Sequence, residues 1–243
     1  MRSLGEQNYE HFAQRYAEQI GTKPFNAYLE RPNTLSLLPD VKGMRVLDAG
    51  CGPGLYSEWL VDHGAEVVAV DVTSAFVKLA GRRLQGRATV LEADLSRRLD
   101  FAADVSFDLV LSSLVLHYIE DWRPVFAEFY RILKPDGLLV FSVMHPFSDY
   151  LYYTENISTD CSYFDTMLME ASWKSWGEPY PLIKSYRRPL GAMLNPLIDA
   201  GFRLDLLLEA LPTEQFREAS PGDYEKCIKQ PFFLCIRAVK GLK

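Results

Sequence analysis

The sequence predicts an α/β fold in which helices cover both faces of a doubly wound, mostly parallel sheet. Apolar runs of strand length alternate with amphipathic runs of helix length between residues 44 and 144. The first apolar run, at 44–49, leads directly into a glycine-rich turn, and an amphipathic segment follows at 55–63. The run at 138–144 is apolar throughout, which is typical of a central strand buried on both faces.

Each expected element has its own pattern in the sequence. Residues 6–20 carry apolar side chains at helical spacing, and a short helix is expected at 34–38, between two prolines. The five expected strands lie at 44–49, 66–71, 88–92, 107–112 and 138–144. The helices expected between them lie at 55–63, 74–84 and 122–133. The connection at 96–106 is too short and polar for a full crossover helix.

The C-terminal part is expected to complete the sheet. A helix is expected at 190–200, with a kink at Pro196. Two strands are expected at 202–209 and 232–239, separated by the polar residues 212–231. Because no apolar helix is expected between these strands, we expect them to form an antiparallel hairpin at the sheet edge.

Length and composition limit the classes of protein to which the chain can belong. Its 243 residues suffice for one large domain over 1–243, and a hydrophobic content of 48% supports a large core. The formal net charge of -6 disfavours a general nucleic-acid-binding protein. The four cysteines form no C-x-x-C pair, which disfavours a metal site and fits a reducing, cytoplasmic location. No apolar run reaches the length of about 18 residues that a membrane helix needs.

The glycine turn at residues 50–54 has the spacing G-x-G-x-G instead of the dinucleotide-binding spacing G-x-G-x-x-G. Gly50, Gly52 and Gly54 can adopt positive φ angles and carry no Cβ, so a ligand can approach their backbone closely. With Asp48 two residues before Gly50, the segment resembles motif I of the class I S-adenosylmethionine-dependent methyltransferases, D-x-G-x-G-x-G. The resemblance implies S-adenosyl-L-methionine (SAM) as cofactor. It also implies a Rossmann-like, seven-stranded sheet of order 3-2-1-4-5-7-6 with an antiparallel last hairpin.

Two further segments carry the same resemblance. Residues 112–118 resemble the fourth motif of the family's small-molecule branch (methyltransferase type 11-like), and residues 131–137 resemble its R-x-L-K-P-G-G turn. Asp136 replaces a glycine of that turn, and Asp-Gly keeps the turn chemistry. The chain lacks the Asp/Asn-Pro-Pro-Tyr/Phe motif of family members that methylate DNA bases or protein glutamine. The resemblance therefore implies a small-molecule acceptor.

Candidate cofactor-binding residues follow the expected strands. Asp71 ends the strand at 66–71, where a carboxylate can accept hydrogen bonds from ribose hydroxyls or cap the next helix. The resemblance places Asp94 against the adenine amine and the Leu95 backbone N–H against a ring nitrogen; the alternative for Asp94 is a capping role. It also places the backbone at Ser112 beside the methionine part of the cofactor.

Two histidines are candidates for catalysis. His117 and His145 follow expected strand ends, on the side of the sheet where ligands bind. An ordinary histidine pKa near 6.5 suits a general base, and the alternative is a histidine that shapes the pocket by hydrogen bonding to the backbone.

Two segments are candidates to cover the cofactor and the acceptor. Residues 146–189 hold ten aromatic side chains and are expected to be a substrate lid over a planar or lipophilic acceptor. The alternative is a hydrophobic cluster under a long loop. In similar methyltransferases an N-terminal helix closes over the cofactor, so the resemblance implies that residues 1–40 form a helical cover from which Tyr16 or Arg31 could reach the cofactor's carboxylate. The alternative for Tyr16 is simple packing of an apolar helix face.

Together these patterns predict an enzyme that transfers methyl from SAM to an O, N or C atom of a small molecule by SN2 displacement. The leaving sulfur becomes neutral, so no metal is expected. One alternative is a non-catalytic binding protein of the same fold. Another is an NAD(P)-dependent oxidoreductase, which shares Asp71 but which the glycine spacing disfavours.

Overall fold

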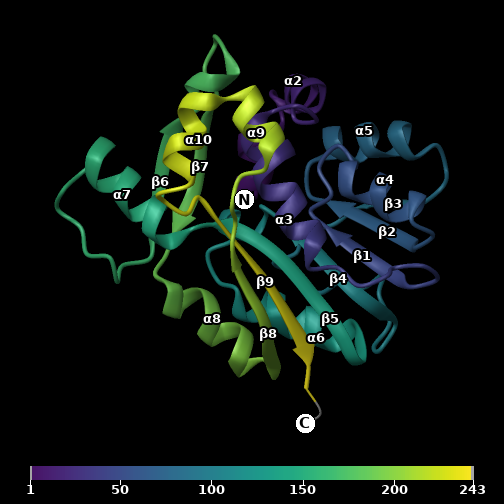
Figure 1. Cartoon of the computed structure of the whole chain (residues 1–243). Coiled ribbons are helices and arrows are strands. Elements are labelled where there is room, and N and C mark those ends of the chain that lie inside the picture. Colours follow the sequence, from purple (N-terminus) through teal and green to yellow (C-terminus); the bar gives the residue numbers. More distant parts are fainter. Residues whose placement is uncertain (1, 242–243) are drawn as a thin grey trace.

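A seven-stranded sheet forms the centre of the protein in a computed structural model that describes residues 2–241 (Figure 1). Its strand order is β3-β2-β1-β4-β5-β9-β8, and β9 runs antiparallel to both of its neighbours. The strands of this sheet are β1 (Arg45–Ala49), β2 (Glu66–Asp71), β3 (Thr89–Glu92), β4 (Phe107–Ser113), β5 (Leu133–Met144), β8 (Phe202–Glu209) and β9 (Phe233–Lys240). The predicted fold class, strand order and antiparallel last hairpin are therefore confirmed, with β8 and β9 as the last two strands.

Helices cover both faces of this sheet (Figure 1). α6 and α8 pack on one face, and α3, α4 and α5 pack on the other. The helices are α1 (Leu4–Tyr9), α2 (Ala13–Gln19), η1 (Phe25–Glu30), α3 (Arg31–Ser36), α4 (Leu55–Asp62), α5 (Ser74–Leu84), η2 (Leu116–Tyr118), α6 (Arg123–Ile132), α7 (Pro146–Asn156), η3 (Lys174–Trp176), α8 (Leu190–Asp199), α9 (Glu214–Ala219) and α10 (Pro221–Cys227).

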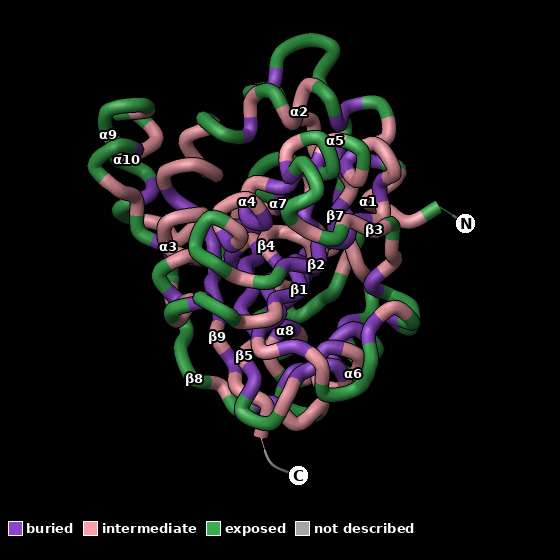
Figure 2. Tube along the Cα trace, turned by 90° about the vertical axis from the view of Figure 1, so that its right-hand side faces the viewer, coloured by how far each residue is buried: buried purple, intermediate pink, exposed green. Residues whose placement is uncertain are grey.

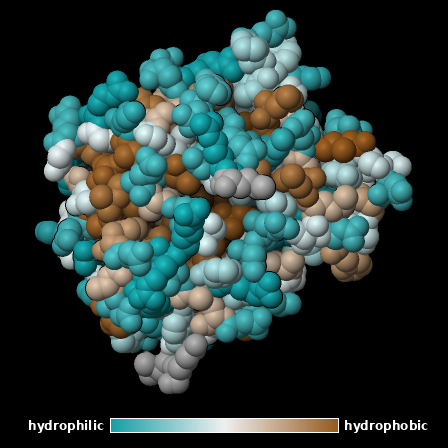
Figure 3. All heavy atoms as spheres, turned by 180° about the vertical axis from the view of Figure 1, so that it is seen from behind, coloured by the Kyte–Doolittle hydropathy of each residue, from teal (hydrophilic) through white to brown (hydrophobic). Residues whose placement is uncertain are grey.

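Alternation along the strands sends side chains into two separate cores. In β1, Leu47 and Ala49 join the core beneath α6, whereas Val46 joins the core beneath α4 and α5. The central strands β1 and β4 are buried on both faces, and buried backbone fills the middle of the molecule in Figure 2. Apolar side chains also gather in patches on the surface, as the view from behind shows in Figure 3. The two cores hold the carboxyl ends of the central strands in place.

The structure corrects several of the expected elements, including the strand expected at 138–144, which begins at Leu133 as β5. The helix expected at 6–20 is two helices, α1 and α2, because the chain turns between them at residues 10–12. The expected polar connection at 212–231 contains α9 and α10. Each of these short helices buries one side chain, Phe216 or Cys227, which is too few to produce a helical pattern in the sequence.

Residues 146–189 fold into α7 and a small second sheet (Figure 1). The strands β6 (Met167–Ser172) and β7 (Leu182–Arg187) form an antiparallel pair outside the main sheet. This hairpin contacts α1, so the segment lies against the N-terminal residues. Among the described residues, none of the helices is long and apolar enough to cross a membrane.

Candidate active site

A cavity lies at the carboxyl edge of the sheet, where β1, β2 and β4 end. The cavity has a volume of about 990 Å³, including the part that is open to solvent. The cavity is lined by six of the residues predicted to bind the cofactor, namely Tyr16, Gly50, Gly52, Asp71, Asp94 and Leu95. Gly54 and Ser112 do not line it. The fold therefore brings most of the predicted cofactor-binding residues to one cavity, although they follow different strands and lie far apart in the sequence.

The Asp71 carboxylate joins the turns that follow β1 and β2. One of its oxygens accepts a hydrogen bond from the Gly52 backbone N–H at 2.9 Å, and the other accepts from the Thr73 backbone N–H at 2.8 Å. Burial raises the pKa of the Asp71 carboxyl, and the two N–H donors oppose this rise. A carboxylate oxygen can accept two hydrogen bonds, so Asp71 keeps acceptor capacity for a ligand in the cavity.

The glycine turn has protein neighbours at two of its three glycines. A Cβ on Gly50 (φ 86°) would lie 2.2 Å from the Val115 side chain, and a Cβ on Gly54 (φ 85°) would lie 3.2 Å from Ala80 on α5. A Cβ on Gly52 (φ 54°) would meet no atom within 4 Å. Gly50 and Gly54 therefore allow the turn to pack against its neighbours, and Gly52 is the glycine whose open side faces free space.

Asp94 makes the hydrogen bonds of a capping residue and also lines the cavity. Its Oδ1 accepts from the Ser96 backbone N–H at 2.9 Å and from the Ser96 hydroxyl at 2.7 Å. Its Oδ2 lies 3.4 Å from Arg97 Nε. The adjacent Leu95 lines the cavity beside it. The capping role and the predicted adenine-binding role can therefore coexist at this position.

Ser112 lies one residue away from the cavity wall. Its side chain is fully buried, and its hydroxyl donates a hydrogen bond to the Ala49 carbonyl oxygen at 2.9 Å, which links β4 to β1. The next residue, Ser113, lines the cavity in its place, because successive side chains of a strand point to opposite faces.

Tyrosine side chains from three short helices gather over the cavity. The Tyr9 and Tyr118 hydroxyls lie 2.7 Å apart, and the Tyr16 ring packs edge-on against the Tyr9 ring, with centroids 5.2 Å apart. All three tyrosines line the cavity. Burial raises the pKa of each hydroxyl, so all three stay neutral hydrogen-bonding groups. The Trp176 ring stacks on Tyr16 at 5.1 Å, so residues 146–189 also contribute to this cluster.

Two charged residues of the N-terminal segment line the same cavity. Glu30 is 2% exposed, and its place in the site was not expected from the sequence. Arg31 was expected as an alternative to Tyr16. Its Nη2 lies 3.4 Å from the Ile20 carbonyl oxygen, and its buried Nε has no hydrogen-bond partner within residues 2–241. A single Glu-Arg pair in a stretch punctuated by prolines gives no periodic signal, so sequence patterns could not place it.

Comparison with known proteins supports one family for this chain. A sequence profile described as a methyltransferase domain matches residues 47–141, from β1 into β5. The crystal structure of an S-adenosylmethionine dependent methyltransferase from Mesorhizobium loti matches with a TM-score of 0.67 and 27% sequence identity. This match covers 90% of the present chain and 99% of that protein's chain. The profile and the structural match support a class I SAM-dependent methyltransferase of the type 11 kind.

Named relatives of the methyltransferase match it over part of the chain. A malonyl-[acyl-carrier protein] O-methyltransferase from Enterobacter lignolyticus is 36% identical over 110 residues, which cover 45% of this chain and 43% of the relative. A ubiquinone biosynthesis O-methyltransferase from Xanthomonas oryzae pv. oryzae is 37% identical over 110 residues, which cover 44% of this chain and 45% of the relative. The chain thus matches less than half of the length of these two relatives.

SAM is the cofactor of the methyltransferase, and the side chains of the cavity fit its polar groups. Asp71 and Asp94 offer carboxylate oxygens beside the ends of β2 and β3, where hydroxyl and amine groups can donate to them. Arg31 brings a buried Nε that lacks a partner among the described residues, which suits a carboxylate. Gly52 lines the same cavity, and a Cβ added to it would meet no atom within 4 Å.

Neither candidate catalytic histidine lines the cavity of the methyltransferase. Burial and the nearby Arg188 charge lower the pKa of His117 to about 3, so its imidazole is neutral at physiological pH. His145 caps α7, because its Nδ1 accepts from the Phe147 backbone N–H at 3.2 Å, and its Nε2 lies 3.0 Å from Glu209 Oε1. Burial lowers the pKa of His145, and Glu209 opposes this shift. The contacts of His145 are those of a residue that shapes the end of β5.

Proposed function

We propose that the methyltransferase transfers a methyl group from SAM to an oxygen, nitrogen or carbon atom of a small molecule. One observation carries this proposal. The cavity runs along the carboxyl ends of four neighbouring strands, in the order β3, β2, β1 and β4. Tyrosine side chains of α1, α2 and η2 form another part of its wall. Such a site can hold an extended cofactor along the strands and an acceptor under the aromatic side chains.

Each part of the cofactor then has a proposed partner. Asp71 would accept the ribose hydroxyls, and Asp94 with the Leu95 backbone would meet the adenine. Gly52, whose Cβ side is open, would let the turn pass close to the cofactor, and Gly50 lines the cavity beside it. Tyr16 and Arg31 would hold the methionine carboxylate, since they line the same cavity and Arg31 Nε is without a partner among the described residues.

The acceptor would lie between the N-terminal residues 1–40 and the insertion 146–189. We propose that these two segments form a cover and a lid over the site, since Trp176 of the insertion stacks on Tyr16 at the cavity wall. Two relatives are named as O-methyltransferases, which favours an oxygen as the acceptor atom. The aromatic lining favours a planar or lipophilic acceptor.

Alignment of the methyl donor with the acceptor, together with exclusion of water, would supply most of the rate enhancement. The bound cofactor supplies a methyl group on a positively charged sulfur, a good leaving group. The chain's own residues hold the two reactants in line, an effect worth about 7–11 kcal/mol in well-oriented systems. The three neutral tyrosine hydroxyls can position the acceptor through hydrogen bonds while their rings keep water out.

Calorimetric titration tests the proposal directly. SAM and S-adenosylhomocysteine are expected to bind with Kd on the order of micromolar, and NADH is expected not to bind. Candidate acceptors are then screened for a mass gain of one CH2 group that depends on SAM and releases S-adenosylhomocysteine. Tight binding of SAM without turnover of any acceptor class would favour the non-catalytic alternative, and binding of NADH alone would refute the proposal.

A further inference from the structure

Glu30 has a buried carboxylate that accepts hydrogen bonds from hydroxyl groups on four different elements. Its Oε1 accepts hydrogen bonds from Thr34 at 2.8 Å, Ser113 at 2.9 Å and Ser142 at 2.6 Å. The Tyr56 hydroxyl lies 2.9 Å from both Oε1 and Oε2. The donors come from α3, β4, β5 and α4, so Glu30 is fixed from several sides at the ends of two neighbouring strands.

The hydroxyl groups around Glu30 act as hydrogen-bond donors to its carboxylate. The Ser142 hydroxyl oxygen already accepts from the Leu114 backbone N–H at 3.2 Å, so its own proton points to Glu30. An ionised carboxylate only accepts hydrogen bonds, and four hydroxyl donors are a set that it can accommodate. Glu30 therefore places a negative charge at the wall of the cavity.

Among the described residues, the Glu30 carboxylate has no ion-pair partner. Within residues 2–241, no Lys, Arg or His nitrogen lies within 4.0 Å of Glu30 in an ion pair. Arg31 follows it in the chain and lines the same cavity, yet donates elsewhere. Buried charges in proteins are ordinarily paired, because an unpaired charge loses its hydration without compensation. Glu30 lines the cavity, so a positively charged ligand bound there can supply the missing partner.

The local backbone keeps Glu30 in this position. Glu30 is the last residue of η1, a π-helical turn that continues directly into α3. Single π-helical turns are rare and often occur at functional sites. Oε2 receives one of the four hydroxyls, from Tyr56, so it keeps acceptor capacity on its free side.

We propose that Glu30 makes the cavity select the positively charged cofactor over the neutral product. This inference rests on the proposed methyl transfer. In that reaction the acceptor's electron pair forms the new bond to the methyl carbon, and the pair of the carbon–sulfur bond stays on sulfur. The sulfonium cation thereby becomes a neutral thioether, S-adenosylhomocysteine. A fixed negative charge stabilises the ligand before transfer and loses this interaction afterwards, which favours product release.

Binding of three ligands to the wild type and to Glu30→Gln tests this role. SAM carries the sulfonium charge, sinefungin carries an ammonium group in place of the methylsulfonium, and S-adenosylhomocysteine is neutral at this position. In Glu30→Gln, the Kd of SAM and of sinefungin is expected to rise about ten-fold more than the Kd of S-adenosylhomocysteine. Thr34→Val is the matched control, because it removes one donor to Glu30 but keeps the charge, and it should change all three Kd values by the same factor.

The outcomes separate this inference from the cofactor assignment. An equal rise for all three ligands in Glu30→Gln, or no change, would overturn charge selection and leave Glu30 as a structural hub. Failure of the wild type to bind any of the three would refute the proposed function itself. If Glu30→Gln does not fold, thermal shifts of the wild type decide. Sinefungin must then stabilise the protein more than S-adenosylhomocysteine at equal concentration, and the reverse order would overturn the proposal.

Discussion

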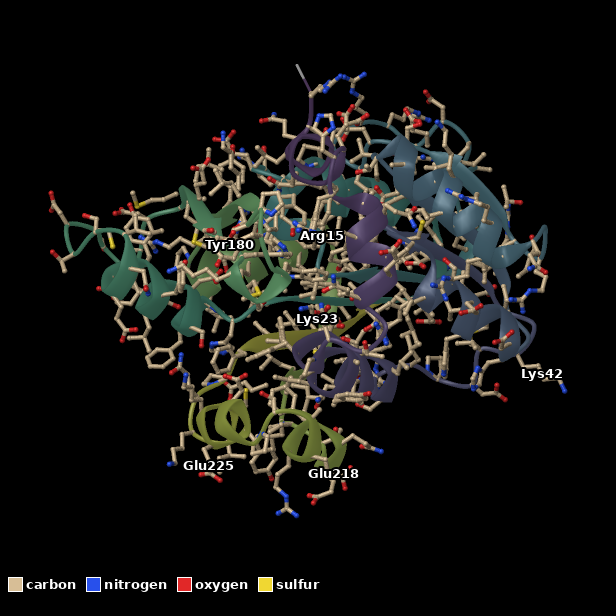
Figure 4. The ribbon with its side chains drawn as sticks, turned by 90° about the horizontal axis from the view of Figure 1, so that it is seen from above. Arg15, Lys23, Lys42, Tyr180, Glu218 and Glu225 are labelled. Atoms are coloured by element: carbon tan, nitrogen blue, oxygen red, sulfur yellow. The ribbon has the colours of Figure 1, made fainter. Side chains whose placement is uncertain are left out.

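Asn8 completes the edge of β7 by pairing with the backbone of Lys184. The Asn8 Nδ2 donates to the Lys184 carbonyl oxygen at 2.9 Å, and the Asn8 Oδ1 accepts from the Lys184 backbone N–H at 2.9 Å. Nearby, Arg15 donates to three carbonyl oxygens of residues 177–179, and Lys23 donates to the Ser175 carbonyl oxygen at 2.6 Å. Figure 4 shows Arg15 lying beside the β6–β7 hairpin. The N-terminal segment and the insertion are therefore fastened to each other over the cavity.

Replacing Asn8 by alanine is expected to loosen this connection. The change removes two part-buried hydrogen bonds and leaves the Lys184 backbone groups without these partners, which should lower the free energy of unfolding by about 1–3 kcal/mol. Hydrogen exchange at the Lys184 amide should become faster. Gln14→Ala is the control, since Gln14 is exposed and pairs only with Glu18 on its own helix. If the Lys184 amide exchanges at the same rate in Asn8→Ala and in Gln14→Ala, Asn8 does not fasten the N-terminal segment to β7.

Replacing Asp71 by alanine is expected to weaken SAM and S-adenosylhomocysteine equally. The ribose is the same in both ligands, so the loss of its acceptor should cost each of them about 1–3 kcal/mol of binding free energy. The two Kd values from calorimetry measure the effect. Asp199→Asn, an exposed change on α8, should leave both unchanged. If Asp71→Ala binds SAM and S-adenosylhomocysteine with unchanged Kd, Asp71 does not bind the ribose.

Asp48 is expected to make stability fall with rising pH. It is 1% exposed and accepts a hydrogen bond from the Ser57 hydroxyl, and burial raises its pKa to about 7. The unfolded pKa is about 3.9, so folding favours the protonated form. This contribution is fully present below about pH 4 and is lost as pH rises to about 7, a change of about 4 kcal/mol.

Urea unfolding between pH 4 and pH 8 measures this contribution. Asp48→Asn is neutral at every pH, so its stability should fall less than that of the wild type across this window. Asp199→Asn should follow the wild-type curve, because Asp199 is exposed. Parallel curves for wild type and Asp48→Asn would mean that the carboxyl is not buried as a protonated acid.

Single changes at the two histidines test whether either acts as a general base. His117→Gln and His145→Gln are expected to keep kcat within about ten-fold of the wild type, since neither imidazole lines the cavity. The pH profile of kcat/KM in the range 5–8 should also keep its shape. A loss of more than about 100-fold with a shifted profile in either variant would establish that residue as a base.

The sequence predicted the part of the fold that follows local patterns. The strands β1, β2 and β4 are rich in apolar residues because they are buried on both faces, and their expected bounds agree closely with the observed ones. The hairpin β6–β7 was not expected, because β6 has a mostly half-exposed, irregular burial pattern. It is held by side chains such as Asn8, which lies 176 residues away from its partner.

The same distinction applies to the site. Gly52 was predicted from the glycine motif after β1 and Asp71 from its place at the end of β2, and both line the cavity. Glu30 was missed because its hydroxyl partners lie up to 112 residues away, and no local spacing connects them. The two histidines follow strand ends as expected, yet fall outside the cavity wall, since position along a strand does not determine which way a side chain points.

The place of β9 between β5 and β8 has a consequence for synthesis of the protein. β5 pairs with β4 on one side and with β9 on the other, from Leu138 opposite Val239 to Met144 opposite Phe233. The ribosome makes β5 almost one hundred residues before it makes β9. Until residue 240 has emerged, one edge of an otherwise buried strand stays unpaired, and the nascent chain must be kept from pairing with other chains.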